Sequence, residues 1–347
     1  MVSDWRYMSP SFMKMKKDED CKKIAEKALI LLRKRGEEAL AIATKAVMSE
    51  EIAYGPLRSA LQYFLQEIRF GAPHSALISL TCEAVGGNPN DTSLIGAAMV
   101  LIASAADIHD DIIDNSEVKN SKLTVFGKFG KNLALLAGDV FLFKGLIILH
   151  EYCKKLPVEK KERILTLLED SFFHLSVAEA KEAGLKGNFN IHPKEYLDII
   201  REKASVIEMY ARIGVVIGGG DLEKENILGQ YGRTLGMLSI IRDEFIDMYE
   251  PDEIKNRIMN ECPPLPLLYA LQNPKIKAKI MKILTKKEVK EDDIYKLIKI
   301  VDRIEDVQKL KVEMKESVEK ILDRCTFVKP QVYRELRLLL SATIEDL

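Results

Sequence analysis

Apolar residues recur at three- and four-residue spacing through long stretches rich in Ala, Leu, Ile, Glu and Lys. This spacing places them on one face of an α-helix, and no run of alternating polar and apolar residues is long enough to argue for a sheet. Glycine and proline are sparse, and their positions predict breaks that divide the chain into about a dozen helices. These breaks fall at residues 70–73, 86–90, 115–123, 184–193, 218–221, 250–252 and 263–266. The pattern therefore predicts an all-α protein.

Three helical stretches are apolar nearly all round, at residues 92–106, 133–150 and 205–217. Helices of this kind lie at the centre of a bundle. Residues 275–300 are amphipathic and rich in lysine, which predicts an outer layer. Because no repeat, low-complexity segment or linker divides the chain, we expect one helical domain over residues 1–347, with the first twenty residues as a candidate flexible segment.

The charge balance argues against a nucleic-acid partner. The chain has 347 residues, and its 52 Lys and Arg nearly cancel its 53 Asp and Glu, which leaves no basic field. Five scattered cysteines without a C-x-x-C pair predict neither disulfides nor a zinc site and favour the cytoplasm. The longest candidate apolar run, residues 94–106, is stopped by Asp107, short of the roughly 18 to 20 residues that a membrane helix needs. We expect no transmembrane segment.

A cluster of carboxylates ends the first apolar helix. Asp107, then Asp110 or Asp111, and then Asp114 follow one another at steps of three or four residues, so they project to one side of the helix. A solvated acidic helix end is the usual explanation for such a run. The apolar helix before it argues otherwise, because burying uncompensated charge is costly. Oxygen ligands grouped in this way suit Mg²⁺.

A second cluster, Asp243, Glu244 and Asp247, has the same i, i+1, i+4 spacing as Asp110, Asp111 and Asp114. It also follows an apolar stretch, residues 235–241. One such pattern is weak evidence. Two of them, each ending an apolar helix and far apart in the sequence, are harder to dismiss. We expect the clusters to face one another across the bundle and to hold several Mg²⁺ ions around one diphosphate.

Four motifs occur in an order that resembles the trans-isoprenyl diphosphate synthases, or polyprenyl synthetases, over nearly the whole chain. They are HDDIID at 109–114, LLAGDVFLF at 135–143, YLDIIREKAS at 196–205 and IIRDEFID at 240–247. The resemblance implies an isoprenoid-synthase type helical bundle with a central cavity, an allylic prenyl diphosphate as substrate, and a homodimer or a heterodimer with a prenyl diphosphate synthase homologue. The metal ligands that it implies are Asp110, Asp111, Asp114, Asp243, Glu244 and Asp247.

The residues of the family's second diphosphate site, which binds isopentenyl diphosphate, are replaced. The lysine and arginine of its G-K-x-x-R element correspond to Gly71 and His74, its helix histidine to Ala103, and the second arginine of its R-R pair to Asn120. Of these residues only His74 can carry charge, and only in part at neutral pH. His74 is therefore retained as a candidate substrate contact, and donor binding is predicted to be lost.

The family's allylic diphosphate site is retained in part. Lys203 is kept as a candidate catalytic and substrate-binding residue, while Lys119 and Arg242 are further candidate substrate contacts. The positions that form the floor of the hydrocarbon pocket in the family are Ala105 and Ala106 here. Such small residues imply a deep tunnel for a long prenyl chain, although close packing of helices explains them equally well.

Three functions remain open at this stage. The favoured one is a terpene-synthase-like lyase that uses Mg²⁺ to ionise a long allylic diphosphate. Its candidate catalytic residues are Asp110, Asp111, Asp114, Lys203 and Asp243. The second is a noncatalytic subunit that modulates an active prenyl diphosphate synthase, and the third is chain elongation with an altered isopentenyl diphosphate site. Intact aspartates favour the first over the second, and the missing basic residues disfavour the third.

Overall fold

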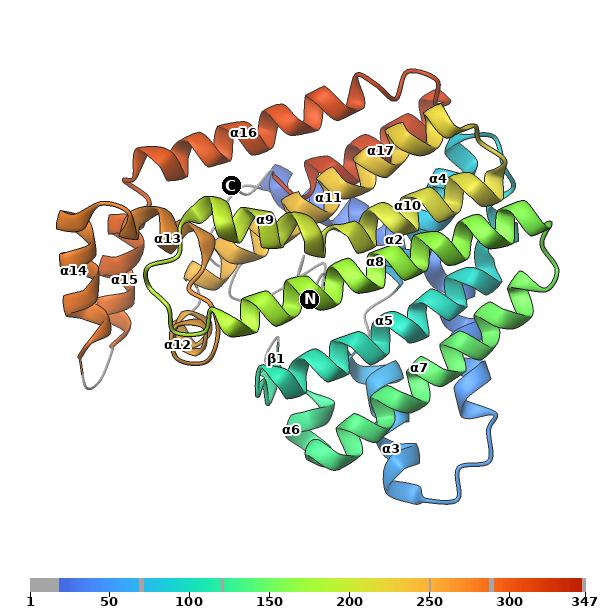
Figure 1. Cartoon of the computed structure of the whole chain (residues 1–347), viewed down its shortest axis with the longest axis horizontal. Coiled ribbons are helices and arrows are strands. Elements are labelled where there is room, and N and C mark those ends of the chain that lie inside the picture. The colour runs from blue at the N-terminus through green and yellow to red at the C-terminus, as the bar shows by residue number, and fades with distance from the viewer. Residues whose placement is uncertain (1–18, 69–71, 120–121, 250, 287–289, 345–347) are drawn as a thin grey trace.

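The computed structural model describes residues 19–68, 72–119, 122–249, 251–286 and 290–344 (Figure 1). The expectation about the first twenty residues lies almost wholly outside this range, as do Gly71 and Asn120 of the second diphosphate site. Nearly all of the described chain is helical, which confirms the predicted all-α class.

The N-terminal half contains helices and one very short hairpin. Its helices are α2 (Glu19–Met48), α3 (Gly55–Tyr63), the π-helical turn η1 (Phe64–Ile68), α4 (Pro73–Ala84), the 3₁₀ turn η2 (Pro89–Thr92), α5 (Ser93–Ile113), α6 (Val125–Phe129) and α7 (Lys131–Cys153). The hairpin between α5 and α6 pairs the antiparallel strands β1 (Val118–Lys119) and β2 (Lys122–Leu123). Alternation over two residues is too short to be recognised in a sequence.

The described residues of the C-terminal half form helices joined by loops. Its elements are α8 (Val158–Gly184), α9 (Pro193–Lys203), α10 (Ser205–Gly218), α11 (Leu222–Tyr249), α12 (Pro251–Asn260), α13 (Leu265–Leu271), α14 (Pro274–Leu284), α15 (Glu291–Val301), α16 (Glu305–Leu322) and α17 (Pro330–Ser341). Proline occupies the first or second position of several of them, where its fixed φ suits a helix and its missing N–H is not needed. This explains why the prolines marked the breaks correctly.

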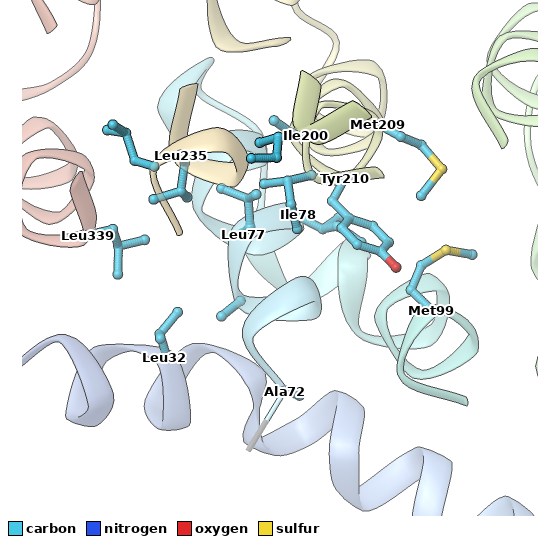
Figure 2. Close-up of a cluster of buried hydrophobic side chains, with 14 of the residues drawn as sticks. Leu32, Ala72, Leu77, Ile78, Met99, Ile200, Met209, Tyr210, Leu235 and Leu339 are labelled. Atoms are coloured by element: carbon cyan, nitrogen blue, oxygen red, sulfur yellow. The ribbon is translucent and has the colours of Figure 1, made fainter. Parts of the chain in front are cut away.

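Two of the predicted central helices form the core. Helix α5 packs against α2, α4 and α7, while α10 packs against α4, α8 and α11. Figure 2 shows side chains of α4 between those of α10 and α11, with Leu77 beside Leu235 and Ile78 beside Tyr210. The amphipathic helices α14 and α15 lie at the edge of the molecule, as the pattern predicted (Figure 1).

Helix α7 is buried on one side only. The prediction that it lies at the centre of the bundle is therefore correct for that side and wrong for the other. Toward α5 it presents Gly138 and Gly145, which allow a close approach; a Cβ at Gly145 would lie 2.7 Å from a side-chain carbon of Ile102. The opposite face is apolar and exposed, and includes Leu136 and Phe143.

Within the described residues, two helical segments are long and apolar enough to span a membrane by length and composition. They are residues 89–113, whose most apolar window is 72% buried, and residues 131–153, whose window is 39% buried. The first is the core helix of the bundle. The second is α7, whose outer face is apolar and exposed.

Candidate active site

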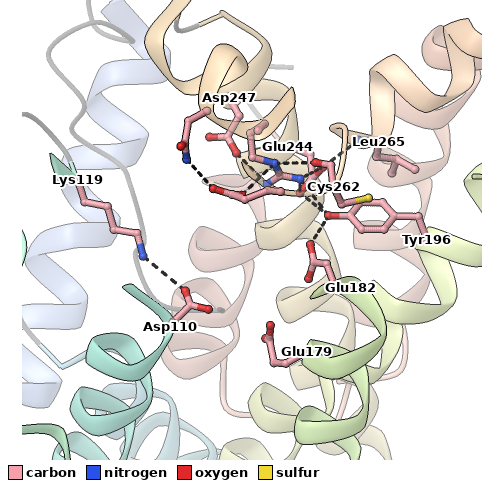
Figure 3. Close-up of polar contacts among 12 residues, drawn as sticks. Asp110, Lys119, Glu179, Glu182, Tyr196, Glu244, Asp247, Cys262 and Leu265 are labelled. Atoms are coloured by element: carbon pink, nitrogen blue, oxygen red, sulfur yellow. Dashed lines mark hydrogen bonds and ion pairs between the residues drawn. The ribbon is translucent and has the colours of Figure 1, made fainter. Parts of the chain in front are cut away.

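The first acidic cluster lies where α5 ends. The backbone N–H of Asp114 closes the last turn by donating to the carbonyl of Asp110 at 2.9 Å, and Asn115 then turns the chain with a φ of 53°. Asp110 and Asp111 are both buried. The hairpin that follows returns Lys119 to this cluster, with its Nζ 2.7 Å from Asp111 Oδ1 and 3.5 Å from Asp110 Oδ2 (Figure 3). Lys119 thus places a positive charge beside both buried aspartates.

The second acidic cluster faces the first across a single cavity. Both clusters belong to its wall, which includes Asp110, Asp114, Lys119, Glu179, Glu182, Lys203, Asp243, Glu244, Asp247, Arg257 and Glu261. Segments 133 residues apart in the sequence, from Asp110 to Asp243, therefore meet in space as their spacing predicted.

Lys203 is held at this cavity by two carboxylates that the sequence reasoning missed. Its Nζ lies 3.2 Å from Glu179 Oε2 and forms an ion pair with Glu182, and both carboxylates come from the end of α8. Burial alone would raise the pKa of Glu182, but the positive charges of Lys203 and Arg257 outweigh it and lower the pKa to about 2. The i, i+3 spacing in AEAKEAG was the available signal, yet it resembles any charged helix face.

Arg257 of α12 is a third residue that the sequence did not single out. Its guanidinium donates to Glu244 Oε1 at 2.8 Å and lies 3.2 Å from Asp247 Oδ2. It also donates to the hydroxyl of Tyr196 at 3.0 Å and to the carbonyl of Cys262 at 3.1 Å. Two carboxylates of the second cluster therefore already have a buried cation beside them.

Tyr196 and Glu244 connect the helices around this arginine. The hydroxyl of Tyr196 lies 2.7 Å from Glu182 Oε1 and 3.0 Å from Glu244 Oε1, and the backbone N–H of Leu265 donates to Glu244 Oε2 at 2.8 Å (Figure 3). Because charge-assisted bonds of this kind are strong and directional, the network fixes α8, α9, α11 and the start of α13 around the cavity.

Other predicted site residues lie away from the cavity wall. Arg242 is buried, with its guanidinium 3.9 Å from Asp243 Oδ1. His74 and Ala106 line a separate small apolar pocket, and Ala105 is buried within the helix packing. Arg242 therefore meets only Asp243 of the acidic clusters, and His74 and Ala106 share their pocket with Asp107 but not with Asp110 or Asp114.

The two clusters differ in how well they suit a metal ion. Burial and the carboxylates of Asp110 and Glu261 raise the pKa of Asp114 to about 7, so the surroundings of Asp114 leave a surplus of negative charge when this carboxylate is ionised. A divalent cation fits that surplus. At the second cluster Glu244 and Asp247 bind Arg257, which leaves Asp243 as the carboxylate outside the arginine's contacts. Among the described residues, no three ligating side chains converge on one point, so the fit rests on charge and not on a formed coordination shell.

Comparison with known proteins agrees with the fold and the motifs. The family model described as Polyprenyl synthetase matches residues 72–301. Because this match covers more than half of the chain, the chain belongs to the polyprenyl synthetase family, as the four motifs indicated.

Curated relatives are similar over only part of their length. A short chain isoprenyl diphosphate synthase from Methanothermobacter thermautotrophicus is 30% identical over 51% of this chain and 54% of its own length. Component 2 of the heptaprenyl diphosphate synthase of Bacillus subtilis is 26% identical over 62% of each chain. The chain thus spans about half the length of the first of these relatives and somewhat more of the second.

Solved structures match nearly end to end. The geranylgeranyl pyrophosphate synthetase from Pyrococcus horikoshii Ot3 superposes with a TM-score of 0.81 at 22% identity, covering 92% of this chain and 98% of that one. At this identity the likeness establishes the fold, and the isoprenoid-synthase bundle is confirmed.

Proposed function

We propose that this protein binds one allylic prenyl diphosphate with Mg²⁺ and ionises it, in the manner of a terpene synthase. The observation that carries the proposal is the single cavity whose wall contains both acidic clusters together with Lys203 and Lys119. Carboxylates that hold a metal and lysines that contact phosphate are the parts that such a step requires.

Each group has a defined task in this proposal. Asp110, Asp111 and Asp114, with Asp243 across the cavity, would hold Mg²⁺, and the metal supplies charge neutralisation to the departing diphosphate. Lys203, oriented by Glu179 and Glu182, adds a fixed positive charge opposite the first cluster. The C–O bond breaks, its electrons leave with the diphosphate, and the remaining allylic cation loses a proton or takes up water.

The four positions that would bind a second diphosphate carry no residue with a fixed positive charge. Ala103 carries no charge, and His74 lies in an apolar pocket instead of at the main cavity. Gly71 and Asn120, although outside the described residues, are uncharged by type. A diphosphate with several negative charges has no adequate counter-charge among these four, which favours ionisation over chain elongation.

Chain elongation is the second candidate, because the curated relatives are isoprenyl diphosphate synthases. One assay separates the two. The protein is incubated with Mg²⁺ and allylic diphosphates of 10, 15 and 20 carbons, with and without labelled isopentenyl diphosphate. Diphosphate release with a hydrocarbon or alcohol product, and no labelled product, supports ionisation alone. Label in a longer prenyl diphosphate establishes elongation, and no turnover in either arm rejects both.

A partner chain is suggested by the outer face of α7. Leu136, Phe143 and Ile147 are each more than half exposed and border one groove. A second copy of this chain or a homologous synthase suits that apolar surface. The similarity to component 2 of a heptaprenyl diphosphate synthase supports the role of a modulatory subunit as a further candidate. Copurification with an active synthase, and a shift in its product length on mixing, would favour that role over independent catalysis.

A further inference from the structure

The hairpin of helices α14 and α15, residues 274–300, carries a local surplus of positive charge. It contains nine lysines, no arginine and four acidic residues, in a chain whose formal charge is −1. The balance over the whole chain therefore hides an uneven distribution, because this hairpin is basic and the remainder is acidic. The two helices lie at one edge of the molecule, away from α7 and its exposed apolar face (Figure 1).

The lysines of α14 form a stripe on its outer face. Lys275, Lys279 and Lys282 follow one another at steps of four and three residues, so they project to the same side of the helix. All three are exposed. On the opposite side Ile280 is fully buried and Ile283 is half-buried. The apolar face of α14 is therefore covered by the protein, and its lysine stripe is left to the solvent.

This stripe differs from other exposed lysines of the protein in having no carboxylate beside it. On α16, Nζ of Lys309 lies 3.0 Å from Glu305, and Nζ of Lys320 lies 3.0 Å from Glu316, each one turn away along the helix. Within the part of the chain that the structure describes, the three stripe lysines make no such ion pair. Their charges are therefore available to an anionic partner.

Helix α15 adds an aromatic ring and a further lysine to the same hairpin. Tyr295 is 55% exposed, and the exposed Lys299 follows it by one helical turn. The carboxylate of Asp293 is buried and lies 2.6 Å from Nζ of Lys286, so it is already balanced, while Asp292 is exposed. A tyrosine combines an apolar ring with a polar hydroxyl, and this combination favours the boundary between lipid and water.

The hairpin is tied to the elements that form the acidic cavity. Nζ of Lys277 donates to the carbonyl of Phe189 at 3.2 Å and to Oδ1 of Asn190 at 2.5 Å. Both acceptors belong to the segment that follows α8, and Lys186 of that segment lines the cavity. Helix α13, which precedes α14, donates its first backbone N–H to Glu244. A surface that holds the hairpin therefore also holds this end of the molecule.

We propose that the exposed face of the α14–α15 hairpin docks on an anionic lipid bilayer. Lysine carries its charge as a compact hydrated group on a flexible stem, which suits a diffuse layer of lipid phosphates. Arginine, whose planar fork recognises single phosphates and carboxylates, is absent from the hairpin. Each lysine near an anionic surface strengthens binding by about fivefold. Because the apolar face of α14 is covered, the contact is electrostatic and the helix does not insert.

Docking goes beyond the proposed function and needs no catalytic step. It would serve that function, however, because loss of the diphosphate converts an amphipathic substrate into an apolar product that dissolves in lipid. A protein held at the bilayer by this hairpin releases such a product next to the phase that takes it up.

The test is cosedimentation of the full chain with vesicles of phosphatidylcholine, alone or with about 30% phosphatidylglycerol, without substrate or Mg²⁺. We expect binding to the anionic vesicles only, weakened at least about tenfold between about 50 and 500 mM NaCl. The combined variant Lys275→Glu, Lys279→Glu and Lys282→Glu should lose at least about 100-fold in affinity.

A variant of the same net charge is the matched control. Lys34, Lys155 and Lys329 are exposed lysines of other elements, likewise without an ion pair to a described residue, and changing all three to glutamate should cost less than about tenfold. Circular dichroism checks the fold, and glutamine replaces glutamate in both variants if either fails to fold.

Three results would overturn the proposal. They are no binding of wild type to anionic vesicles at low salt, equal losses in the two triple variants, and tighter binding to a short single-stranded RNA at the same phosphate concentration. The last result would assign the hairpin to nucleic acid. None of them affects the ionisation assay, which needs no vesicles, so docking and the proposed function fail or stand separately.

Discussion

The guanidinium of Arg257 donates to both carboxylate oxygens of Glu244, at 2.8 and 3.0 Å, inside the wall of the proposed active site. Asp247 lies against the same guanidinium. Two of the three carboxylates of the second motif are therefore balanced by a cation that belongs to the protein. The third, Asp243, lies outside the contacts of Arg257, with its Oδ1 3.9 Å from the guanidinium of Arg242.

Replacing Arg257 by glutamine is expected to have two effects. The free energy of unfolding should drop by about 3 kcal/mol or more, because one partner of a buried ion pair is removed and the other is left uncompensated. At the same time Glu244 and Asp247 become available, so the number of Mn²⁺ ions bound per chain, counted by electron paramagnetic resonance, should rise. Exposed Arg201, replaced by glutamine, is the matched control and should change stability by no more than about 0.5 kcal/mol. An unchanged metal count in a folded Arg257→Gln variant would show that these carboxylates do not compete for metal.

Asp114→Asn should stabilise the metal-free protein at high pH. Burial and the carboxylates of Asp110 and Glu261 raise the pKa of Asp114 to about 7 in the folded state, above the roughly 3.9 of an ordinary aspartate. The folded state therefore holds this proton more tightly than the unfolded state. Its contribution to stability is complete below pH 4 and is lost as the pH rises through 7.

At pH 8 in EDTA the Asp114→Asn variant should therefore exceed wild type by about 1 to 2 kcal/mol in free energy of unfolding, and at pH 5 the difference should shrink. Added Mg²⁺ should raise the melting temperature of wild type more than that of the variant, because the variant has lost a ligand. Exposed Asp170, replaced by asparagine, serves as control. A variant less stable than wild type in EDTA at pH 8 would contradict the charge surplus on which the metal fit rests.

The sequence could predict the clusters but not their partners, and the reason is physical. Spacing along one helix determines which side chains share a face, so Asp110 and Asp114 could be grouped before any fold was known. Arg257 meets Glu244 only because α12 turns back against α11, and nothing in the local sequence distinguishes Arg257 from an exposed arginine. The departure of His74 from the phosphate site has the same origin, since its ring direction is set by packing between α4 and α10.

Which helices are buried was also predicted from the residues of each helix alone. Apolar residues all round a helix indicate that every side must be covered, which holds for α5 and α10 within this chain. For α7 the same pattern indicated burial, yet its outer side is exposed among the residues that the structure describes. Periodicity specifies that a face is apolar; it does not specify which molecule covers it.

Glu182→Gln should weaken the protein in a pH-dependent way. The positive charges of Lys203 and Arg257 overcome the effect of burial and lower the pKa of Glu182 to about 2. Its ionised form therefore stabilises the fold above the ordinary glutamate range, and this contribution is lost as the pH falls from about 5 toward 2. At pH 7 the variant should lose about 2 to 3 kcal/mol of unfolding free energy relative to wild type, and the gap should close toward pH 3. Denaturant titrations at pH 7, 5 and 3 measure it, with exposed Glu169→Gln as control; a gap that is constant with pH would show that the lost packing, and not the charge, is responsible.

Phe143→Glu tests whether the outer face of α7 joins two chains. The ring is 65% exposed in the isolated chain, and Leu136 and Ile147 lie beside the same groove. Contiguous apolar surface of this kind marks an interface, and a carboxylate placed in it would lose hydration on association. Light scattering after gel filtration should give the mass of a dimer for wild type and of a monomer for the variant. Lys131→Glu, at the exposed start of the same helix, should remain a dimer.

If wild type alone is monomeric but forms a complex when mixed with a prenyl diphosphate synthase, and Phe143→Glu abolishes that complex, then the face serves a heteromer. In that case the ionisation assay has to be repeated with the partner present before catalysis is assigned to this chain.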